Sequence, residues 1–293
     1  MKVLVYGSIN IDMNYHVDHI VLPGETISAL KFEKSAGGKG ANQAAALAKA
    51  GLEVYMAGKA GRDGDFLLEL LRSYGVNTGH VAVYEGPTGH AIIQLDKNKQ
   101  NSIFLFSGGN GEITLEEIDS TLESFGKGDL IVLQNEIVHL GEIIGAAAER
   151  EMVICLNPSP YNPDIETLPL ERVNVFFVNE IEGAAMAGLP ACRDFQAILE
   201  RLAARFPAAE FILTAGPEGA FYARGKERAG APIVESPVLD TVGAGDTFSG
   251  YFIAARSRGY TPQEALDLAA RAASIAVSRP GAMASVPRAD EVF

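Results

Sequence analysis

The sequence predicts an α/β fold: a mostly parallel central sheet with helices on both faces, plus a small separate β-sheet. Short β-branched or aromatic runs alternate with helix-like segments along most of the 293 residues. Two long segments, about 13–34 and 80–106, interrupt this alternation. The length suits a single α/β domain over 1–293 that carries a small appendage.

The expected strands of the central sheet are short and apolar throughout, as strands buried on both faces are. They are 3–6, 54–58, 130–133, 153–156, 175–178 and 211–214, and the helices expected between them include 115–124, 140–150 and 195–206. Parallel strands end at one edge of a sheet, so the polar residues that follow them should converge there. These residues are Asn10, Glu136, Asn157, Asn179 and Thr214.

The two interrupting segments show alternating apolar and polar residues and no good helical period. We interpret 13–34 and 80–106 as strands of the small sheet, with the turn-rich 96–101 joining two of them. A small sheet alone exposes an apolar face, so this one is expected to cover another part of the molecule.

Composition limits the classes of partner. The net charge of −13 argues against nucleic acid or an anionic membrane as a partner, because both require a surplus of Lys and Arg. Cys155 and Cys192 are the only cysteines, and their contexts indicate free thiols of a reducing cytosol. No stretch approaches transmembrane length, and residues 1–3 run directly into a strand, so we expect a cytoplasmic protein.

A glycine motif at 240–250 carries the strongest chemical signal. Val238 and Leu239 are expected to end a strand, and 248–256 to form an amphipathic helix. The backbone N–H groups of Gly243, Ala244 and Gly245 would then form an anion hole at a helix N-terminus. Asp246 beside that hole is placed to act as a general base, the arrangement that phosphoryl transfer to a hydroxyl requires. The alternative is an ordinary helix start.

A second glycine motif, 36–44, precedes an alanine-rich helix that ends near Gly51. Lys39 and Asn42 are three residues apart and share one helix face. Asn10 and Asp12, after the first strand, point the same way if the chain stays extended. The preference of Asn and Asp for turns at strand ends explains Asn10 or Asp12 taken alone. Together with Lys39 and Asn42, they indicate a pocket for a polyol.

Other sites lack support. The sequence contains neither a Gly-x-x-x-x-Gly-Lys-Ser/Thr P-loop nor a Gly-x-Gly-x-x-Gly fingerprint. His16 and His19 have no further ligand at metal-binding spacing. Asp63 and Asp65 are most simply helix-start residues.

These motifs, together with 7–12 and Pro23-Gly24-Glu25-Thr26, resemble the ribokinase family of ATP-dependent sugar kinases in order and spacing, over nearly the whole chain. The resemblance implies sugar contacts at Asn10, Asp12, Gly38, Lys39, Asn42, Glu136 and Asp246. It implies Asp246 as catalytic base, with Gly243, Ala244 and Gly245 as the anion hole. It implies nucleotide contacts at Asn179, Glu182, Thr214, Gly216, Gly219 and Gly245, with Glu182 reaching Mg²⁺ through phosphate or water. It implies a K⁺ site at Asp240, Val242, Ala276, Arg279, Gly281 and Ser285.

The resemblance also implies that the small sheet is a lid over the sugar and pairs with a second subunit's lid in a homodimer. The reaction it implies is phosphorylation of the primary hydroxyl of a pentose, D-ribose first. Another furanose, a ketose or a nucleoside is the alternative acceptor, and a catalytically silent sugar- or nucleotide-binding regulator is an alternative of another class. Two departures bear on the acceptor: His90 replaces a small apolar lid residue, and Ser107-Gly108-Gly109-Asn110 replaces Pro-Gly-Ala-Asn. His90 either faces solvent or changes the choice of sugar.

Overall fold

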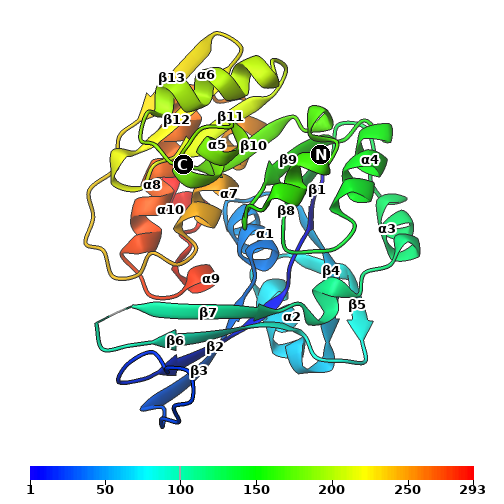
Figure 1. Cartoon of the computed structure of the whole chain (residues 1–293). Coiled ribbons are helices and arrows are strands. Elements are labelled where there is room, and N and C mark those ends of the chain that lie inside the picture. The colour runs from blue at the N-terminus through cyan, green and yellow to red at the C-terminus, as the bar shows by residue number, and fades with distance from the viewer. Residues whose placement is uncertain (99) are drawn as a thin grey trace.

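The computed structural model describes residues 1–98 and 100–293; Lys99, in the turn expected within the small sheet, lies outside the described residues. In this part of the chain the central sheet has nine strands, in the order β13-β12-β11-β10-β9-β8-β1-β4-β5 (Figure 1). They are β1 Val3–Tyr6, β4 Val54–Gly61, β5 Asn77–Tyr84, β8 Leu130–Gln134, β9 Val153–Asn157, β10 Val175–Asn179, β11 Glu210–Thr214, β12 Ala220–Arg224 and β13 Glu227–Ala231. The strands from β11 to β5 pair in parallel, and β12 and β13 are antiparallel. The predicted fold class is confirmed.

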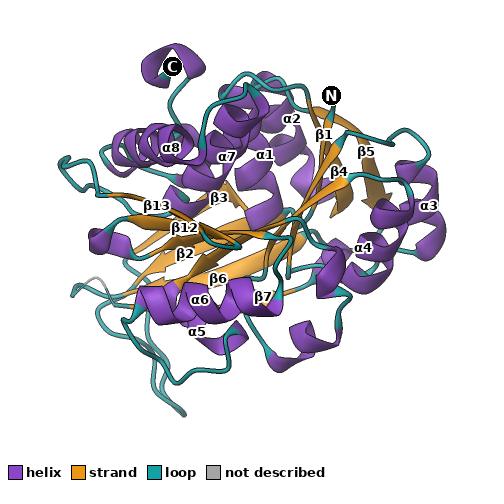
Figure 2. Ribbon diagram, turned by 90° about the horizontal axis from the view of Figure 1, so that it is seen from above, coloured by secondary structure: helices purple, strands orange, loops and turns teal. Residues whose placement is uncertain are grey.

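Helices cover both faces of the sheet (Figure 2). One face carries α1 Lys39–Lys49, α2 Asp65–Ser73, α7 Ala244–Ser257 and α8 Pro262–Val277; the other carries α3 Leu115–Leu122, α4 Leu140–Glu149, α5 Glu180–Met186 and α6 Phe195–Arg205. Alternation along β1 supplies both layers, since Val3 and Val5 face the first and Leu4 and Tyr6 the second. The short α9 Ala282–Ser285 and α10 Ala289–Val292 follow α8.

The small sheet has the strand order β3-β2-β6-β7 in the described part of the chain and lies below the central sheet in Figure 1. Its strands are β2 Asn10–His16, β3 Lys31–Gly37, β6 Gly89–Leu95 and β7 Asn101–Phe106. The expectation that residues 80–84 belong here was wrong. They form part of β5, which pairs with β4 at the edge of the central sheet. An edge strand exposed on one face alternates as a lid strand does, so periodicity could not separate the two.

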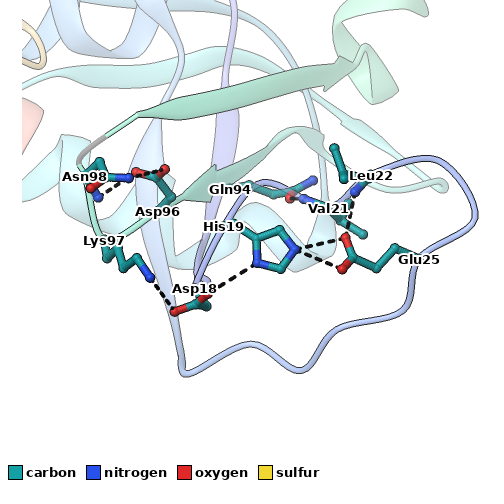
Figure 3. Close-up of polar contacts among 9 residues, drawn as sticks. All are labelled: Asp18, His19, Val21, Leu22, Glu25, Gln94, Asp96, Lys97 and Asn98. Carbon is teal, nitrogen blue, oxygen red and sulfur yellow. Dashed lines mark hydrogen bonds and ion pairs between the residues drawn. The ribbon is translucent and has the colours of Figure 1, made fainter.

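The loop of residues 17–30 connects β2 to β3 at the far end of the small sheet. Figure 3 shows His19 between the carboxylates of Glu25 and Asp18. Its ring nitrogens lie 2.9 Å from Glu25 Oε1 and 3.3 Å from Asp18 Oδ2. Asp18 also pairs with Lys97 at 3.1 Å, which joins the loop to the turn after β6. The loop is therefore held by exposed ion pairs.

Two expectations about the 240–250 motif were wrong in detail. Val238 and Leu239 lie outside any described strand and are each 67% exposed. The backbone N–H of Leu239 donates to Val277 O, so the chain here caps the end of α8 instead of joining the sheet. The helix that follows begins at Ala244, four residues earlier than expected, and it is buried continuously from Asp246 to Ala255, so it is a central helix and not an amphipathic one.

No described helix is both long and apolar enough to cross a membrane.

Candidate functional site

The order of the central sheet reverses at β1, which lies between β8 and β4. Ligands of open α/β sheets bind where such a reversal opens a crevice beyond the carboxyl ends of the strands. Asn10 follows β1, and Glu136 follows β8, the neighbouring parallel strand. The N-terminus of α1, at Lys39, lies against the same crevice, because Lys39 N donates to Glu136 Oε2 at 3.3 Å and Ala41 N to Ser8 O at 3.0 Å.

A pocket of about 270 Å³ lies in this crevice and is lined by Asn10, Phe106, Asn110 and Glu136, among others. Asn110 was not expected to bind there. Its Nδ2 donates to Asn10 Oδ1 at 2.7 Å, and its Oδ1 accepts from Ile9 N at 3.0 Å. Asn110 therefore fixes the Asn10 amide, and a Cβ at Gly89 would collide with both side chains.

Asp12 and Glu136 form an acidic pair in the crevice. Burial raises the pKa of Asp12 to about 6, and the negative charge of Glu136 adds to that rise. Glu136 accepts hydrogen bonds from the Ser8 hydroxyl and from Lys39 N. The close approach of these segments needs Gly38, whose φ is +92° and whose Cβ would lie 2.8 Å from Asn10 N. Two carboxylates with amide donors beside them form a surface suited to sugar hydroxyls.

His90 lies on the face of the small sheet opposite to Asp12. Residues in register share a face: Asp12 pairs with Ala91, whereas His90 pairs with Ile11 and with Phe106. The His90 ring lies 5.1 Å from that of Phe106, and its Nδ1 is 3.1 Å from Thr88 O. The small residues Gly89 and Ala91 are the ones that share the face of Asn10 and Asp12.

Asp246 lies in the first turn of α7 and is 9% exposed. Its Oδ2 accepts from Asn42 Nδ2 at 3.1 Å, and its Oδ1 accepts from Gln43 Nε2 at 3.0 Å. Gln43 Oε1 in turn accepts from Gln134 Nε2 at 2.7 Å. The carboxylate predicted as base thus adjoins the 36–44 motif, although 203 residues separate it from Gln43.

The residues predicted to form an anion hole lie at the start of α7, where the Ala244 N–H donates to Thr241 O at 3.3 Å. Gly243 precedes the helix with φ of +75° and provides no side-chain cap. The first intrahelical bond runs from Thr247 N to Gly243 O at 2.8 Å, so the N–H groups of Gly245 and Asp246 precede the hydrogen-bond ladder. Such groups, with the positive end of the helix dipole, stabilise an anion.

A second pocket, of about 840 Å³, adjoins that turn. Five of the predicted nucleotide and anion-hole residues line it: Thr214, Gly216, Gly219, Ala244 and Gly245. Its wall is otherwise largely apolar and includes Ile233, Val234, Val238, Phe248 and Val277. An apolar slot that ends at a helix N-terminus suits a flat base with a phosphate tail.

Asn179 and Glu182 stand apart from the other predicted nucleotide residues. They form the capping box of α5: Asn179 Oδ1 accepts from Ile181 N and Glu182 N, and Glu182 Oε2 accepts from Asn179 N at 3.1 Å. Asn179 is in register with Thr214, which lines the large pocket. Asn179 and Glu182 are not among the described residues that line that pocket. Their side chains are occupied by the helix start.

The residues predicted to hold K⁺ come together partly. Asp240 Oδ1 accepts from Val242 N at 3.0 Å and Oδ2 from Gly281 N at 2.9 Å. Ala276 O accepts from Arg279 N, and the Arg279 guanidinium pairs with Glu291, which leaves only backbone atoms of Arg279 for a cation. The hydroxyl of Ser285 donates to Ala282 O at 2.8 Å, beside Gly243. Each Asp240 oxygen retains lone pairs, so the set can accept a monovalent cation.

Sequence reasoning missed Gln43, Gln134, Asn110 and Ser8. The signal for Gln43 was a glutamine inside an alanine run whose neighbours are all buried; the signal for Gln134 was an amide at the end of the apolar strand β8. Both patterns predict only that a polar side chain needs a partner.

Comparisons with known proteins agree with this geometry. The model of the pfkB family carbohydrate kinases matches residues 1–289. The ribokinase of Bacillus subtilis (strain 168) is 33% identical over 298 residues, covering 99% of this chain and 98% of that protein.

Two solved structures share the fold. Ribokinase from Cryptococcus neoformans var. grubii serotype A, in complex with ADP, superposes with a TM-score of 0.88 at 33% identity, covering 99% of this chain and 98% of that one. Arabidopsis thaliana ribokinase, complexed with ribose and ATP, gives a TM-score of 0.87 at 30% identity, with 99% and 96% covered. The resemblance seen in the motifs is thereby confirmed: this chain belongs to the pfkB family of carbohydrate kinases, phosphotransferases with an alcohol group as acceptor.

Proposed function

We propose that this protein transfers the γ-phosphoryl group of ATP to the primary hydroxyl of a pentose, with D-ribose as the acceptor. The observation that carries the proposal is the position of Asp246. It lies in the helix turn that borders the large apolar pocket, and it is hydrogen-bonded to Asn42 of the 36–44 motif. Ribose, ATP and ADP are the ligands named for the two solved relatives.

In the reaction we propose, the sugar lies between Asn10, Asp12, Lys39, Asn42 and Glu136, with Gly38 giving it room. Asp246 accepts the proton of the primary hydroxyl while that oxygen forms a bond to the γ-phosphorus. The bond from phosphorus to the bridging oxygen breaks, and ADP leaves with the electron pair. The backbone N–H groups of Gly243, Ala244 and Gly245 stabilise the charge on the transferring group, for which the Ala244 N–H must release Thr241 O.

The nucleotide is proposed to occupy the 840 Å³ pocket. Its base lies against the apolar wall, and its phosphates run past Thr214, Gly216 and Gly219 to the start of α7. When bound, Mg²⁺ neutralises phosphate charge during the transfer. The described residues hold no group of three or more His, Cys, Asp or Glu suited to a metal. Glu182, engaged with Asn179, would therefore reach Mg²⁺ only through phosphate or water.

A monovalent cation, K⁺, is proposed beside the anion hole, held by Asp240 and by backbone atoms of Val242, Ala276, Arg279 and Gly281, with Ser285 near. This site adjoins Gly243, whose Cβ would lie 3.1 Å from Ala282. A cation there would fix the turn that carries the N–H donors, so its effect should fall on turnover.

The small sheet is proposed to be a lid on the single 1–293 domain and the surface of a homodimer. Its strand β7 leaves Ile103, Phe104, Leu105 and Phe106 each about half exposed. An apolar strip of this kind is a binding surface when it recurs on a second copy. Because ATP is an intracellular donor and Cys155 and Cys192 are free thiols, the cytoplasm is the compartment we propose.

The test is ADP release from ATP and Mg²⁺ across D-ribose, 2-deoxy-D-ribose, fructose and several nucleosides, with K⁺ present or replaced by Na⁺. The proposal expects selective turnover with D-ribose and a loss of rate without K⁺. Selective turnover with another acceptor would retain the kinase and reject ribose. No turnover with any acceptor, together with sugar binding seen by thermal shift, would favour a silent regulator.

A further inference from the structure

Two buried amides that are not among the described residues lining either pocket are aligned with the Asp246 carboxylate. Gln43, on α1, is 1% exposed, and Gln134, at the end of β8, is 0% exposed. The hydrogen bonds run in one direction: Gln134 Nε2 donates to Gln43 Oε1 at 2.7 Å, and Gln43 Nε2 donates to Asp246 Oδ1 at 3.0 Å.

The direction of these bonds follows from the amide chemistry. A carboxylate only accepts, so Gln43 must present its NH₂ group to Asp246. Its Oε1 then points away and needs a donor, which Gln134 supplies. Without Gln134, the Gln43 amide could turn over and place its oxygen against the carboxylate, where the two would repel.

Gln134 occupies its position at an energetic disadvantage. Its Oε1 is buried and has no hydrogen-bond partner among the described residues. A buried acceptor without a partner destabilises a fold, and the rest of β8, Leu130–Leu133, is apolar and buried. The packing at this position alone would therefore favour an apolar side chain. A Cβ at Gly7, the residue that follows β1, would collide with the Gln134 amide, so the absence of a side chain there makes room for it.

The two Asp246 oxygens have different surroundings. Oδ2 lies at Asn42, in the motif that faces the crevice, whereas Oδ1 lies at Gln43, in the interior. With one oxygen held from inside, the carboxylate cannot rotate freely about its last bond. Its second oxygen is then held toward the crevice, where the sugar hydroxyl is proposed to lie. Tight packing of α1 on α7 makes this reach possible, since a Cβ at Gly250 would lie 2.7 Å from Ala46 Cβ.

We infer that Gln43 and Gln134 are positioning residues that act through Asp246: they fix the carboxylate so that Oδ2 meets the hydroxyl whose proton it accepts. This inference rests on the proposed role of Asp246 as base. It assigns to the two glutamines an effect on turnover and little effect on sugar binding.

The experiment is a double-mutant cycle with D-ribose, ATP, Mg²⁺ and K⁺. Gln43→Leu keeps the size of the side chain and removes both polar groups. We expect kcat to fall about 10- to 100-fold, because a catalytic group displaced by a fraction of an ångström loses that much, while KM for ribose changes less than about threefold. In an Asp246→Asn background, Gln43→Leu should lower kcat by less than about twofold, since there is no carboxylate left to position.

Gln134→Leu is the second variant, for use if Gln43→Leu does not fold, and it should lower kcat in the same way. Leu47→Ala, at a fully buried position of the same helix, is the matched control. It should lower Tm and leave kcat unchanged below Tm. Equal loss of kcat from Gln43→Leu in both backgrounds would show a general structural effect and overturn the inference.

This experiment distinguishes a failure of the positioning role from a failure of the proposed base. If Asp246→Asn is impaired and Gln43→Leu and Gln134→Leu turn over as wild type, only the positioning role fails. If Asp246→Asn itself turns over as wild type, the proposed base is wrong and the positioning role fails with it.

Discussion

Asp12→Asn should stabilise the fold at neutral and alkaline pH while weakening sugar binding. Burial and the charge of Glu136 raise the pKa of Asp12 from 3.8 to about 6. A carboxyl group with a raised pKa binds its proton more tightly in the folded state than in the unfolded state. The free energy of unfolding therefore falls as pH rises from about 4 to about 6, and it stays at the lower value above that range.

The size of the effect follows from the shift. About two pKa units correspond to about 3 kcal/mol, and because Asp12 is only half-buried, solvent screening reduces this to about 1–2 kcal/mol. An amide of the same shape does not carry the charge. We therefore expect Asp12→Asn to raise the free energy of unfolding by about 1–2 kcal/mol at pH 8 and to leave it nearly unchanged at pH 4.

The assay is urea denaturation of both proteins at several pH values, alongside steady-state kinetics with D-ribose. KM for ribose should rise about 10- to 100-fold, the cost of losing a hydrogen bond to a charged group. Asp119→Asn, on the exposed face of α3, is the control and should change stability by less than about 0.5 kcal/mol at every pH. If Asp12→Asn destabilises the protein equally at pH 4 and pH 8, the reasoning about this acidic pair is refuted.

Three further predictions concern the lid, the cation site and the helix contact. The hydrogen bonds of His19 to Glu25 and Asp18 raise its pKa, so the stabilisation that His19 gives residues 17–30 is present below about pH 6.5 and is lost as pH rises through the raised value. Amide exchange at Val21 and Leu22, corrected for the intrinsic rate, should quicken over that range in wild type and show no such step in His19→Ala. Asp240→Asn should raise the K⁺ concentration needed for half-maximal activation about tenfold and leave KM for ribose unchanged, as measured by titrating the rate with K⁺. An unaltered K⁺ response would exclude this site. Gly250→Ala should cost about 1–3 kcal/mol in urea denaturation, because its Cβ meets Ala46 across the packed helices; a stability equal to wild type would contradict the tight α1–α7 contact.

The central sheet was predictable because most of its strands have a recognisable pattern within their own few residues. The runs that became β1, β8, β9, β10 and β11 are short, apolar and bounded by polar residues, which is the pattern of strands buried on both faces. Strand β5 was not separable from the lid, since its assignment depends on pairing with β4 and not on its own alternation. The prediction for the segment before α7 was wrong for a related reason: Val238 and Leu239 have strand-like side chains, but the backbone N–H groups of Leu239 and Asp240 donate to Val277 O at the end of α8.

The candidate site was predictable where one short motif contains both the backbone and the side chains, as at 36–44 and 240–250. It was not predictable where function depends on helices packing together. Nothing near Gln43 in the sequence indicates that its amide meets a carboxylate 203 residues away. The three-residue spacing of Asn179 and Glu182 is typical of a helix capping box, which is what they form. The same spacing is compatible with a site near phosphates, so the sequence could not distinguish the two roles.

Asp246→Asn is a clean substitution for testing the chemistry. Gln43 can still donate to the remaining oxygen. Asn42 Nδ2 faces the other oxygen, so the Asn42 amide must turn over; its Oδ1, which has no partner among the described residues, then accepts from the new amide. The fold and the sugar pocket should therefore persist in the variant.

The measurement that tests the central claim most directly is the steady-state rate of ADP formation from ATP and D-ribose by wild type and Asp246→Asn. We predict that the variant loses about two to four decades in kcat, the range for removal of a general base, with KM for ribose within about threefold of wild type. A variant that turns over D-ribose at the wild-type rate would contradict the assignment of Asp246 as the base.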